Sequence, residues 1–596
     1  MSKQFRERLA AIRSRFGEWN VDAVMVPRFD EHQGEYCAPH DERLAFLTGF
    51  TGSAGSCLVL ADRAVLFVDG RYQVQVRQET DAASFEIAHA IDRPVERWLD
   101  EEGPARLRLG LNAMLLPFNA YDRLSRSLAR LGGEVVALDA DPVDAIWPEQ
   151  PDKPLGAVYP VPLERAGETS ASKRARVAAR LRELRVDLLV EAQPDNIAWL
   201  LNLRGTDVAY TTAPHSFLLL DDKGDVEWFV DGRKLPNDRA TLEILDVTLA
   251  SPDTLAARIA ERAGGHTVLV DPDYAGAALT FAASNAGGRI ERQMSPVTLL
   301  KAHKNKAELQ GFRDCHVEDG VAWTNFNAWL LREGPERLGA GRPVDELEVE
   351  QRILAFRQLS PDFIGSSFHS ISASGANAAM CHYSSSAATN ASITGDAPFL
   401  LDSGGHYLSG TTDATRTVAL APQGEAVRAA YTAVLKGFLA MLMLRFPAGT
   451  YGHQIDAFAR RALWDLGLDY DHGTGHGVGH LGAIHEVPHR FTRGANLFRI
   501  EAGLVLTVEP GYYREGAFGI RIENEVEVVE AGNGFLRLES LTLIPIAIDM
   551  ADRAALTPDE IACLDGYHER VRAQLLDKVL PETRDYLIEA TAPLSY

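Results

Sequence analysis

The last third of the chain contains the stretch His472-Gly473-Thr474-Gly475-His476-Gly477-Val478-Gly479-His480, followed by His485 and His489. Its glycines allow the backbone to approach another group closely and leave the imidazoles accessible. The spacing is not the G-x-G-x-x-G of dinucleotide-binding domains, and no strand–turn–helix unit with a ribose-binding acid surrounds it. The stretch therefore disfavours a dinucleotide site and predicts histidines that bind another ligand.

Two aspartates lie upstream of this stretch, around predicted strands. Asp402 follows the apolar run Phe399-Leu400-Leu401, and Asp413 lies 11 residues further on, after the turn residues Ser403-Gly404-Gly405 and Ser409-Gly410. A strand, a tight connection and a returning strand would set the two carboxylates side by side. Two such carboxylates cannot both stay ionised without a cation, so the pair predicts a metal site.

Two glutamates repeat the pattern downstream. Glu509 follows the apolar strand predicted over 504–508, and Glu523 lies in a strand predicted from Gly519 to Val529. Strand alternation places Arg521 and Glu523 on one face, so a salt bridge between these two is the alternative interpretation.

Two aspartates, two glutamates and at least one histidine suit a hard or borderline divalent ion, such as Mn, Co, Fe or Zn. The absence of cysteine from the set disfavours a structural zinc site. Four carboxylates exceed what one ion needs, so we expect a dinuclear site. Two ions about 3.5–4 Å apart can hold a bridging hydroxide and polarise a carbonyl, which is hydrolytic chemistry.

Composition excludes several other classes of protein. The 596 residues include 83 acidic and 60 basic side chains, for a net charge of −23. This surplus repels phosphate backbones and anionic lipid surfaces, so no nucleic-acid or membrane partner is expected. The five cysteines are odd in number and form no C-x-x-C pair, which favours the cytoplasm. The longest apolar run, Phe438 to Leu444, is far below the roughly 20 residues of a membrane span.

Two breaks divide the chain. Residues 148–162 contain five prolines and predict an extended linker. A Ser-Pro step and a lysine cluster over 294–306 precede a long helical pattern. We therefore expect three domains, over 1–155, 156–300 and 301–596, the last of which mixes helices with antiparallel-looking strands in an α+β arrangement.

The first two domains show a distant internal duplication. Three strings recur in the same order: Val21-Asp22-Ala23-Val24-Met25-Val26 with Val186-Asp187-Leu188-Leu189-Val190, Ala45-Phe46-Leu47-Thr48-Gly49-Phe50 with Ala198-Trp199-Leu200-Leu201-Asn202-Leu203, and Val68-Asp69-Gly70-Arg71 with Val230-Asp231-Gly232-Arg233. Each copy alternates predicted helices and strands, which indicates two duplicated α/β domains.

The order Asp402, Asp413, His476, Glu509, Glu523 resembles the ligand set of the pita-bread metallopeptidases, which include methionyl aminopeptidase, prolidase and aminopeptidase P. Matching strings include Thr411-Thr412-Asp413-Ala414-Thr415-Arg416-Thr417, Glu509-Pro510-Gly511-Tyr512-Tyr513 and Gly519-Ile520-Arg521-Ile522-Glu523-Asn524. In the N-terminal region, Asp30-Glu31-His32-Gln33 and Phe50-Thr51-Gly52-Ser53-Ala54-Gly55 look like the three-domain Xaa-Pro aminopeptidases of the cytosolic eukaryotic type. The resemblance implies two creatinase-like N-terminal domains and a pita-bread catalytic domain.

The resemblance also implies roles for single residues. Asp402 would bind one of two divalent ions, and His476, with Glu509 beside it, would bind the other. Asp413 would bind both ions and Glu523 would bridge them. The ions are expected to be Mn²⁺, with Co²⁺ or Zn²⁺ as alternatives. Glu509 would also act as general base for a metal-bridging water or hydroxide that attacks the Xaa–Pro carbonyl.

Substrate-binding roles follow in the same way. His382 and His485 would contact the substrate as catalytic residues, and Arg521 and Tyr513 would complete the substrate side of the site by holding Glu523 and the water. The implied substrates are short peptides with proline in second position, cleaved by a cytoplasmic homodimer. Three positions depart from the family's usual residues, namely Val487, His480 and His369. These three residues are expected to change the shape of the substrate pocket and not its ligand set.

Three alternatives remain at this point. Prolidase shares the five ligands, and only chain length and the tandem N-terminal domains favour aminopeptidase P. A non-catalytic pita-bread binding module and a creatinase-type enzyme use the fold without these ligands, so the five residues argue against both.

Overall fold

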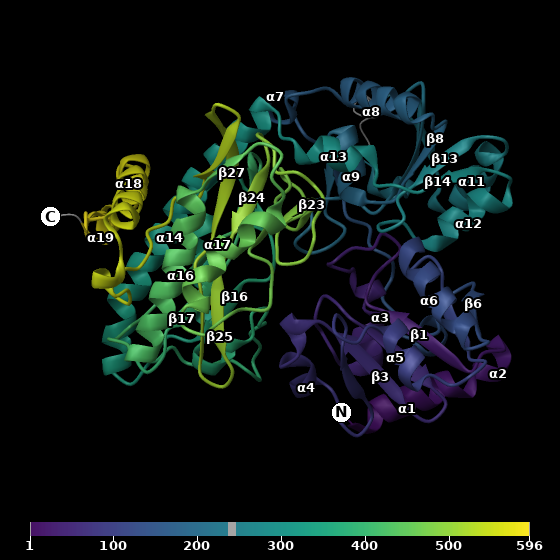
Figure 1. Ribbon diagram of the computed structural model, residues 1–596, viewed down its shortest axis with the longest axis horizontal. Helices are drawn as coiled ribbons and strands as arrows, with labels where there is room; N and C mark the ends of the chain where they lie inside the picture. Colours follow the sequence, from purple (N-terminus) through teal and green to yellow (C-terminus); the bar gives the residue numbers. More distant parts are fainter. Residues whose placement is uncertain (1, 236–245, 595–596) are drawn as a thin grey trace. The chain divides into compact units, whose positions relative to one another are not determined.

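The computed structural model describes residues 2–235 and 246–594 (Figure 1). Contacts within the chain divide it into two compact units. The first unit comprises the residues before Glu164 together with Glu168–Leu300, and the second comprises Glu164–Gly167 together with Lys301–Tyr596. Helix α13, Pro296–Ala302, crosses the residue at which the second break was predicted.

The first unit contains two six-stranded sheets of the same topology. One sheet has the order β4-β3-β2-β1-β5-β6 and the other has the order β12-β11-β10-β8-β13-β14. The strands of the first sheet are β1 Ala23–Pro27, β2 Ser56–Leu60, β3 Ala64–Val68, β4 Glu86–His89, β5 Arg108–Asn112 and β6 Glu134–Leu138. Those of the second are β8 Leu188–Glu191, β10 Phe217–Asp221, β11 Val226–Phe229, β12 Thr248–Ala250, β13 Thr267–Val270 and β14 Arg289–Glu291.

Corresponding strands also pair in the same directions. In each sheet the three strands that come first in the chain pair antiparallel, and the remaining neighbours pair parallel. The repeated Asp-Gly-Arg caps a 3₁₀ turn in both copies: the Asp69 carboxylate accepts the Arg71 N–H, and the Asp231 carboxylate accepts the Arg233 N–H. The duplication predicted from the sequence is therefore confirmed.

The second unit is built around the six-stranded sheet β21-β28-β27-β24-β22-β23, with three-stranded sheets β16-β17-β20 and β15-β18-β19 and the pair β25-β26. The strands that matter for the site are β16 Ile371–Ser374, β17 Phe399–Asp402, β20 Thr415–Val418, β22 Gly475–Gly477, β23 Glu486–Phe491, β24 Val505–Val508, β25 Gly511–Arg514, β26 Phe518–Arg521 and β27 Asn524–Gly532. The principal helices are α14 Lys306–Gly339, α15 Glu346–Arg357, α16 Glu425–Met443, α17 Gly452–Trp464 and α18 Pro558–Leu575.

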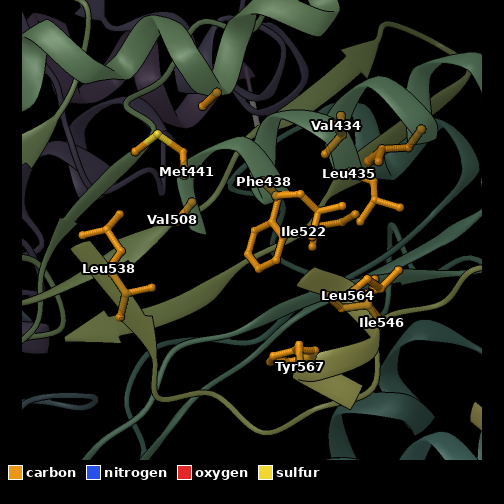
Figure 2. Close-up of a cluster of buried hydrophobic side chains, with 14 of the residues drawn as sticks. Val434, Leu435, Phe438, Met441, Val508, Ile522, Leu538, Ile546, Leu564 and Tyr567 are labelled. Carbon is orange, nitrogen blue, oxygen red and sulfur yellow. The ribbon is translucent and has the colours of Figure 1, made fainter. Parts of the chain in front are cut away.

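The core of this unit lies between α16, the strands and α18. Figure 2 shows Val434, Leu435 and Phe438 of α16 gathered with Ile522 and Leu564, and all five are fully buried. Among the described residues, α16 is the one helix long and apolar enough to cross a membrane by length and composition. Its buried apolar side chains belong to this protein core, which accounts for much of its composition.

Two strand predictions need correction. The strand predicted from Gly519 to Val529 is two strands in different sheets, β26 and β27, because the chain turns at Ile522 and Glu523. There the Ile522 N–H donates to the Pro510 carbonyl and the Glu523 N–H donates to the Thr415 carbonyl. The strand predicted to return beside Phe399–Asp402 is β20, which pairs antiparallel with β17. The connection between them is not a simple tight turn, since it contains strands β18 Gly405–Tyr407 and β19 Gly410–Thr411 of another sheet.

Candidate metal centre

Three of the five predicted ligands meet at one point in the second unit. Asp413, His476 and Glu523 each offer a ligand atom, and these atoms lie within 4.8 Å of one another. Asp413 precedes β20, His476 is the middle residue of β22, and Glu523 occupies the turn between β26 and β27. All three side chains are buried, so strand ends from several sheets bring polar groups into one interior cluster.

Glu509 extends this cluster. It follows β24 directly, and its backbone N–H donates to the Thr474 carbonyl at 2.8 Å. The His476 Nε2 atom lies 3.6 Å from Asp413 Oδ2 and 3.6 Å from Glu509 Oε1. Because His476 Nδ1 donates to the Gly477 carbonyl at 3.0 Å, Nε2 is left as the nitrogen that faces the carboxylates.

The glycines around His476 make this placement possible. A Cβ atom on Gly475 would collide with the Thr507 carbonyl oxygen, and one on Gly477 would collide with the Glu486 carbonyl oxygen. Only glycine lets β22 lie this close to its neighbours. The close backbone approach predicted from the sequence is therefore observed, and it is made by protein strands.

Asp402 joins the cluster through an arginine. It ends β17, opposite Thr415 of β20, and its Oδ2 atom accepts from Arg521 Nη2 at 2.6 Å. Arg521 also donates to Thr415 Oγ1 at 3.0 Å and to the Tyr513 hydroxyl at 2.5 Å. The predicted alternative, a salt bridge from Arg521 to Glu523, is not the pair that forms, because the turn after Arg521 takes Glu523 off its strand.

Glu523 is oriented by Thr415 instead. The Thr415 hydroxyl donates to Glu523 Oε2 at 2.7 Å, and the Glu523 N–H returns a hydrogen bond to the Thr415 carbonyl. Arg416, the next residue, is 2% exposed and fixes the same turn, because its guanidinium donates to the carbonyl of Glu523 at 2.7 Å and to Asn524 Oδ1 at 2.8 Å. Sequence reasoning gave neither residue a role, although both lie in the string around Asp413.

The electrostatics of the cluster call for a cation. Burial, followed by repulsion from Glu523, raises the pKa of Asp413 well above its ordinary value. Burial, followed by repulsion from Glu509, does the same to the pKa of Glu523. Burial raises the pKa of Glu509 to about 7, although Arg521 acts in the opposite direction. Carboxylates crowded together in this way stay ionised only beside positive charge.

The donor set fits two divalent ions. Four carboxylates and one imidazole offer more ligand atoms than one ion requires, and Asp402 Oδ1 is buried without a hydrogen bond from any described residue. Among the described residues, Arg521 forms an ion pair with this set through Asp402. The oxygen-rich mixture with one nitrogen suits Mn²⁺, Co²⁺ or Zn²⁺.

The two predicted substrate-contacting histidines occupy different places. His485 immediately precedes β23, and its ring centroid lies 4.4 Å from that of His476, with the ring planes at 87°. His382 follows the 3₁₀ turn Gly375–Ala379 and is half-buried. The neighbouring carbonyl of Cys381 accepts from Arg521 Nη2 at 3.4 Å, which ties the His382 segment to the arginine of the site.

Other residues singled out in the sequence have contacts of their own. His472 Nε2 lies 3.0 Å from the Tyr513 hydroxyl, whereas His480 Nε2 donates to the Ser409 carbonyl at 2.7 Å. His489 packs against the ring of His303. Of the three departures from the family, His480 and Val487 are buried and His369 Nδ1 donates to the Ser370 carbonyl. None of these residues belongs to the three-residue ligand cluster.

Comparison with known proteins assigns the two units to families. Residues 311–530 match the model of metallopeptidase family M24, and residues 534–594 match the C-terminal region of that peptidase family. Residues 8–145 and 149–308 each match a creatinase/prolidase N-terminal domain. The predicted fold, two creatinase-type domains followed by a pita-bread catalytic domain, is confirmed.

Relatives match over nearly the whole chain. Aminopeptidase P1 of Arabidopsis thaliana is 33% identical, with 96% of this chain and 97% of the relative covered. A probable Xaa-Pro aminopeptidase P of Laccaria bicolor is 36% identical, with 96% and 90% covered. The crystal structure of an X-prolyl aminopeptidase from Caenorhabditis elegans, described as a cytosolic enzyme with a di-nuclear active site, matches with a TM-score of 0.93 at 32% identity, covering 99% of this chain and 100% of that one. The chain belongs to metallopeptidase family M24, among its aminopeptidase P enzymes.

Proposed function

We propose that this chain is an Xaa-Pro aminopeptidase that releases the N-terminal residue from peptides with proline in second position. The observation that supports this most strongly is the convergence of Asp413, His476 and Glu523, with Glu509 and Asp402 beside them, in a chain that matches aminopeptidase P from end to end. A non-catalytic pita-bread module or a creatinase-type enzyme would not need this ligand set.

The five residues would hold two divalent ions, for which Mn²⁺ is our first candidate. Asp402 would serve one ion and His476 with Glu509 the other, while Asp413 and Glu523 would be shared. Arg521 and Thr415 keep Asp402 and Glu523 in place. When bound, a pair of divalent ions polarises a carbonyl and lowers the pKa of a water molecule.

Glu509 is the proposed general base. A general base must lie within reach of the water that it deprotonates, and the half-buried Glu509 carboxylate lies beside the proposed ion-binding residues, with Oε1 3.6 Å from His476 Nε2. Its carboxylate would take a proton from the attacking water and deliver it to the proline nitrogen as the Xaa–Pro bond breaks. The products are a free amino acid and a peptide that begins with proline.

Substrate contacts are proposed for His382, His485, Arg521 and Tyr513. The ring of His485 stands across that of His476 and would face the scissile carbonyl. Tyr513 and Arg521 form one hydrogen-bonded pair on the side of Asp402. A bond to proline has no N–H and a fixed ring, so a site that binds the free N-terminus and encloses the ring can select it.

The experiment that tests this function separates it from prolidase. Purified protein loaded with Mn²⁺ is given an Xaa-Pro-Xaa tripeptide and the matching Xaa-Pro dipeptide, and the products are separated by liquid chromatography. We expect release of the first residue from the tripeptide and much slower cleavage of the dipeptide. Preferential cleavage of the dipeptide would make the chain a prolidase.

A matched pair of variants tests whether His476 binds an ion while His485 contacts the substrate. His485→Ala should keep the metal content of the native protein and lose most of kcat, because the histidine is proposed to contact the substrate and no ion. His476→Ala should lose one ion, because its Nε2 faces Asp413 and Glu509. Metal analysis, melting temperature and kcat on one tripeptide check both. Full turnover in His485→Ala, or loss of the same ion from both variants, would contradict the division.

The chain is further proposed to have domain boundaries near residues 155 and 300. We propose a cytoplasmic enzyme, which agrees with the description of the C. elegans protein as cytosolic. We also propose a homodimer that acts on short peptides without nucleic-acid or membrane partners, to be checked by light scattering during gel filtration.

A further inference from the structure

The first unit contains a second group of metal-binding side chains. Asp30, Asp41 and His215 each offer one ligand atom, and these atoms lie within 4.8 Å of one another. Asp30 follows β1 and Asp41 ends the 3₁₀ turn Pro39–Asp41, both in the first N-terminal domain, whereas His215 precedes β10 in the second. We propose that this cluster binds one divalent metal ion, which joins the two N-terminal domains.

Asp30 gives the first reason for a cation. Its side chain is buried, with the residue 1% exposed, and its Oδ1 atom accepts the backbone N–H groups of His32 and Gly34, both at 2.9 Å. Its Oδ2 atom accepts no hydrogen bond from any residue that the structure describes. A buried carboxylate oxygen without a donor costs free energy, and a cation bound to this atom would remove that cost.

The distance between Asp30 and His215 gives the second reason. His215 Nε2 lies 3.4 Å from Asp30 Oδ2, beyond the usual hydrogen-bond range of about 2.7–3.2 Å. Zinc–ligand bonds of about 2.0–2.2 Å place tetrahedral donor atoms about 3.4 Å apart. The two atoms therefore have the separation of two ligands on one ion.

The charges around the cluster give the third reason. Arg43 binds Asp41 at 2.9 Å but also binds Asp144 at 2.6 Å, and Arg28 binds Glu42 at 2.9 Å. Both arginines thus have carboxylate partners other than Asp30. Arg28 attracts Asp30 electrostatically, but within the described ranges no lysine or arginine forms an ion pair with Asp30. A divalent ion would add positive charge directly at the Oδ2 atom.

Hydrogen bonds fix the backbone of the loop that carries His215, the proposed imidazole ligand. The His215 N–H donates to Asp207 Oδ2 at 2.7 Å, and Lys234 Nζ donates to the same oxygen at 2.7 Å. These contacts fix the backbone while leaving the imidazole directed at Asp30. Two carboxylates and an imidazole suit Zn²⁺, Mn²⁺ or Co²⁺, and binding across two domains would stabilise their contact.

Ion counting with Zn²⁺ tests the proposal independently of the catalytic centre. The native protein and the Asp413→Ala variant each serve as a parent, and His215→Ala is added to both. After equilibration with Zn²⁺ and gel filtration, we expect His215→Ala to lower the zinc content by one ion per chain in each background. Zn²⁺ should also raise the melting temperature of the Asp413→Ala parent and not that of its His215→Ala derivative.

Two further variants keep the test decisive. Asp30→Asn keeps the side-chain volume and should remove the same ion. Asp141→Asn is the matched control, since Asp141 is an equally buried aspartate of the first domain outside the cluster, and it should keep that ion. The proposal is overturned if the chelator-treated Asp413→Ala parent binds no zinc, or if folded His215→Ala and Asp30→Asn proteins hold as much zinc as their parents. If the proposed catalytic centre were wrong, the zinc content of the two parent proteins would change. The loss of one ion on adding His215→Ala would still be seen in both.

Discussion

Glu509→Gln should reduce kcat by roughly 10²–10⁴-fold, the cost of losing a positioned general base. The substitution keeps the size of the side chain but removes its negative charge, so it removes the proton acceptor and weakens a metal ligand in one step. The fold should survive, because the backbone N–H of Glu509 still donates to the Thr474 carbonyl. Steady-state kinetics on a tripeptide and circular dichroism check these two expectations.

The matched control for this variant is Glu515→Gln. Glu515 lies in the exposed turn between β25 and β26, so its loss should leave both rate and metal content unchanged. The general-base role would be wrong if Glu509→Gln stayed within tenfold of the native rate at saturating Mn²⁺.

Asp413→Ala should lose both catalytic ions and all measurable activity. Asp413 is the residue proposed to contact both ions, and it stands at the centre of the cluster, within 3.6 Å of His476 Nε2. Elemental analysis should therefore find two ions fewer per chain than in the native protein. An ion at the proposed site in the first unit would remain and would be counted separately.

The control variant is Asp396→Ala. Asp396 is exposed and lies just before β17, the strand that Asp402 ends. It should keep its metals and its turnover. Normal metal content and activity in Asp413→Ala would rule out the ligand assignment, whatever the identity of the ions.

Much of the fold follows from local patterns. Apolar residues recur at helical spacing over 307–333, 424–446 and 453–466, which predicts three helices, and the structure has α14, α16 and α17 at these places. The duplication could be predicted because the repeated Asp-Gly-Arg makes the same capped turn in both domains. The acids that end apolar strands led to the site because a buried carboxylate needs a partner.

The remaining details depend on tertiary contacts that periodicity does not encode. Alternation predicted that Arg521 and Glu523 share a face, but the hydrogen bonds of Ile522 and Glu523 to Pro510 and Thr415 turn the chain between two sheets. Arg521 therefore pairs with Asp402, which lies 119 residues away in sequence. Contacts at such separations arise only when the sheets assemble.

The proposed metal cluster in the first unit could not be predicted from the sequence either. Asp30 lies in the string Asp30-Glu31-His32-Gln33, and the residues around it in sequence give no signal of a metal site. Its proposed co-ligand His215 belongs to the other copy of the duplicated domain, and neither copy contains the set alone. Only the packing of one domain on the other brings these ligand atoms together.

Five residues of one chain are proposed to hold two ions. An anomalous difference map from a crystal of the Mn²⁺-loaded protein, recorded on both sides of the manganese edge, would show each ion and its ligands. We expect two peaks about 3.5–4 Å apart in the second unit. Asp413 and Glu523 should contact both peaks, Asp402 one, and His476 with Glu509 the other. A single peak there, or two peaks that these residues do not contact, would rule out a dinuclear site held by these five ligands.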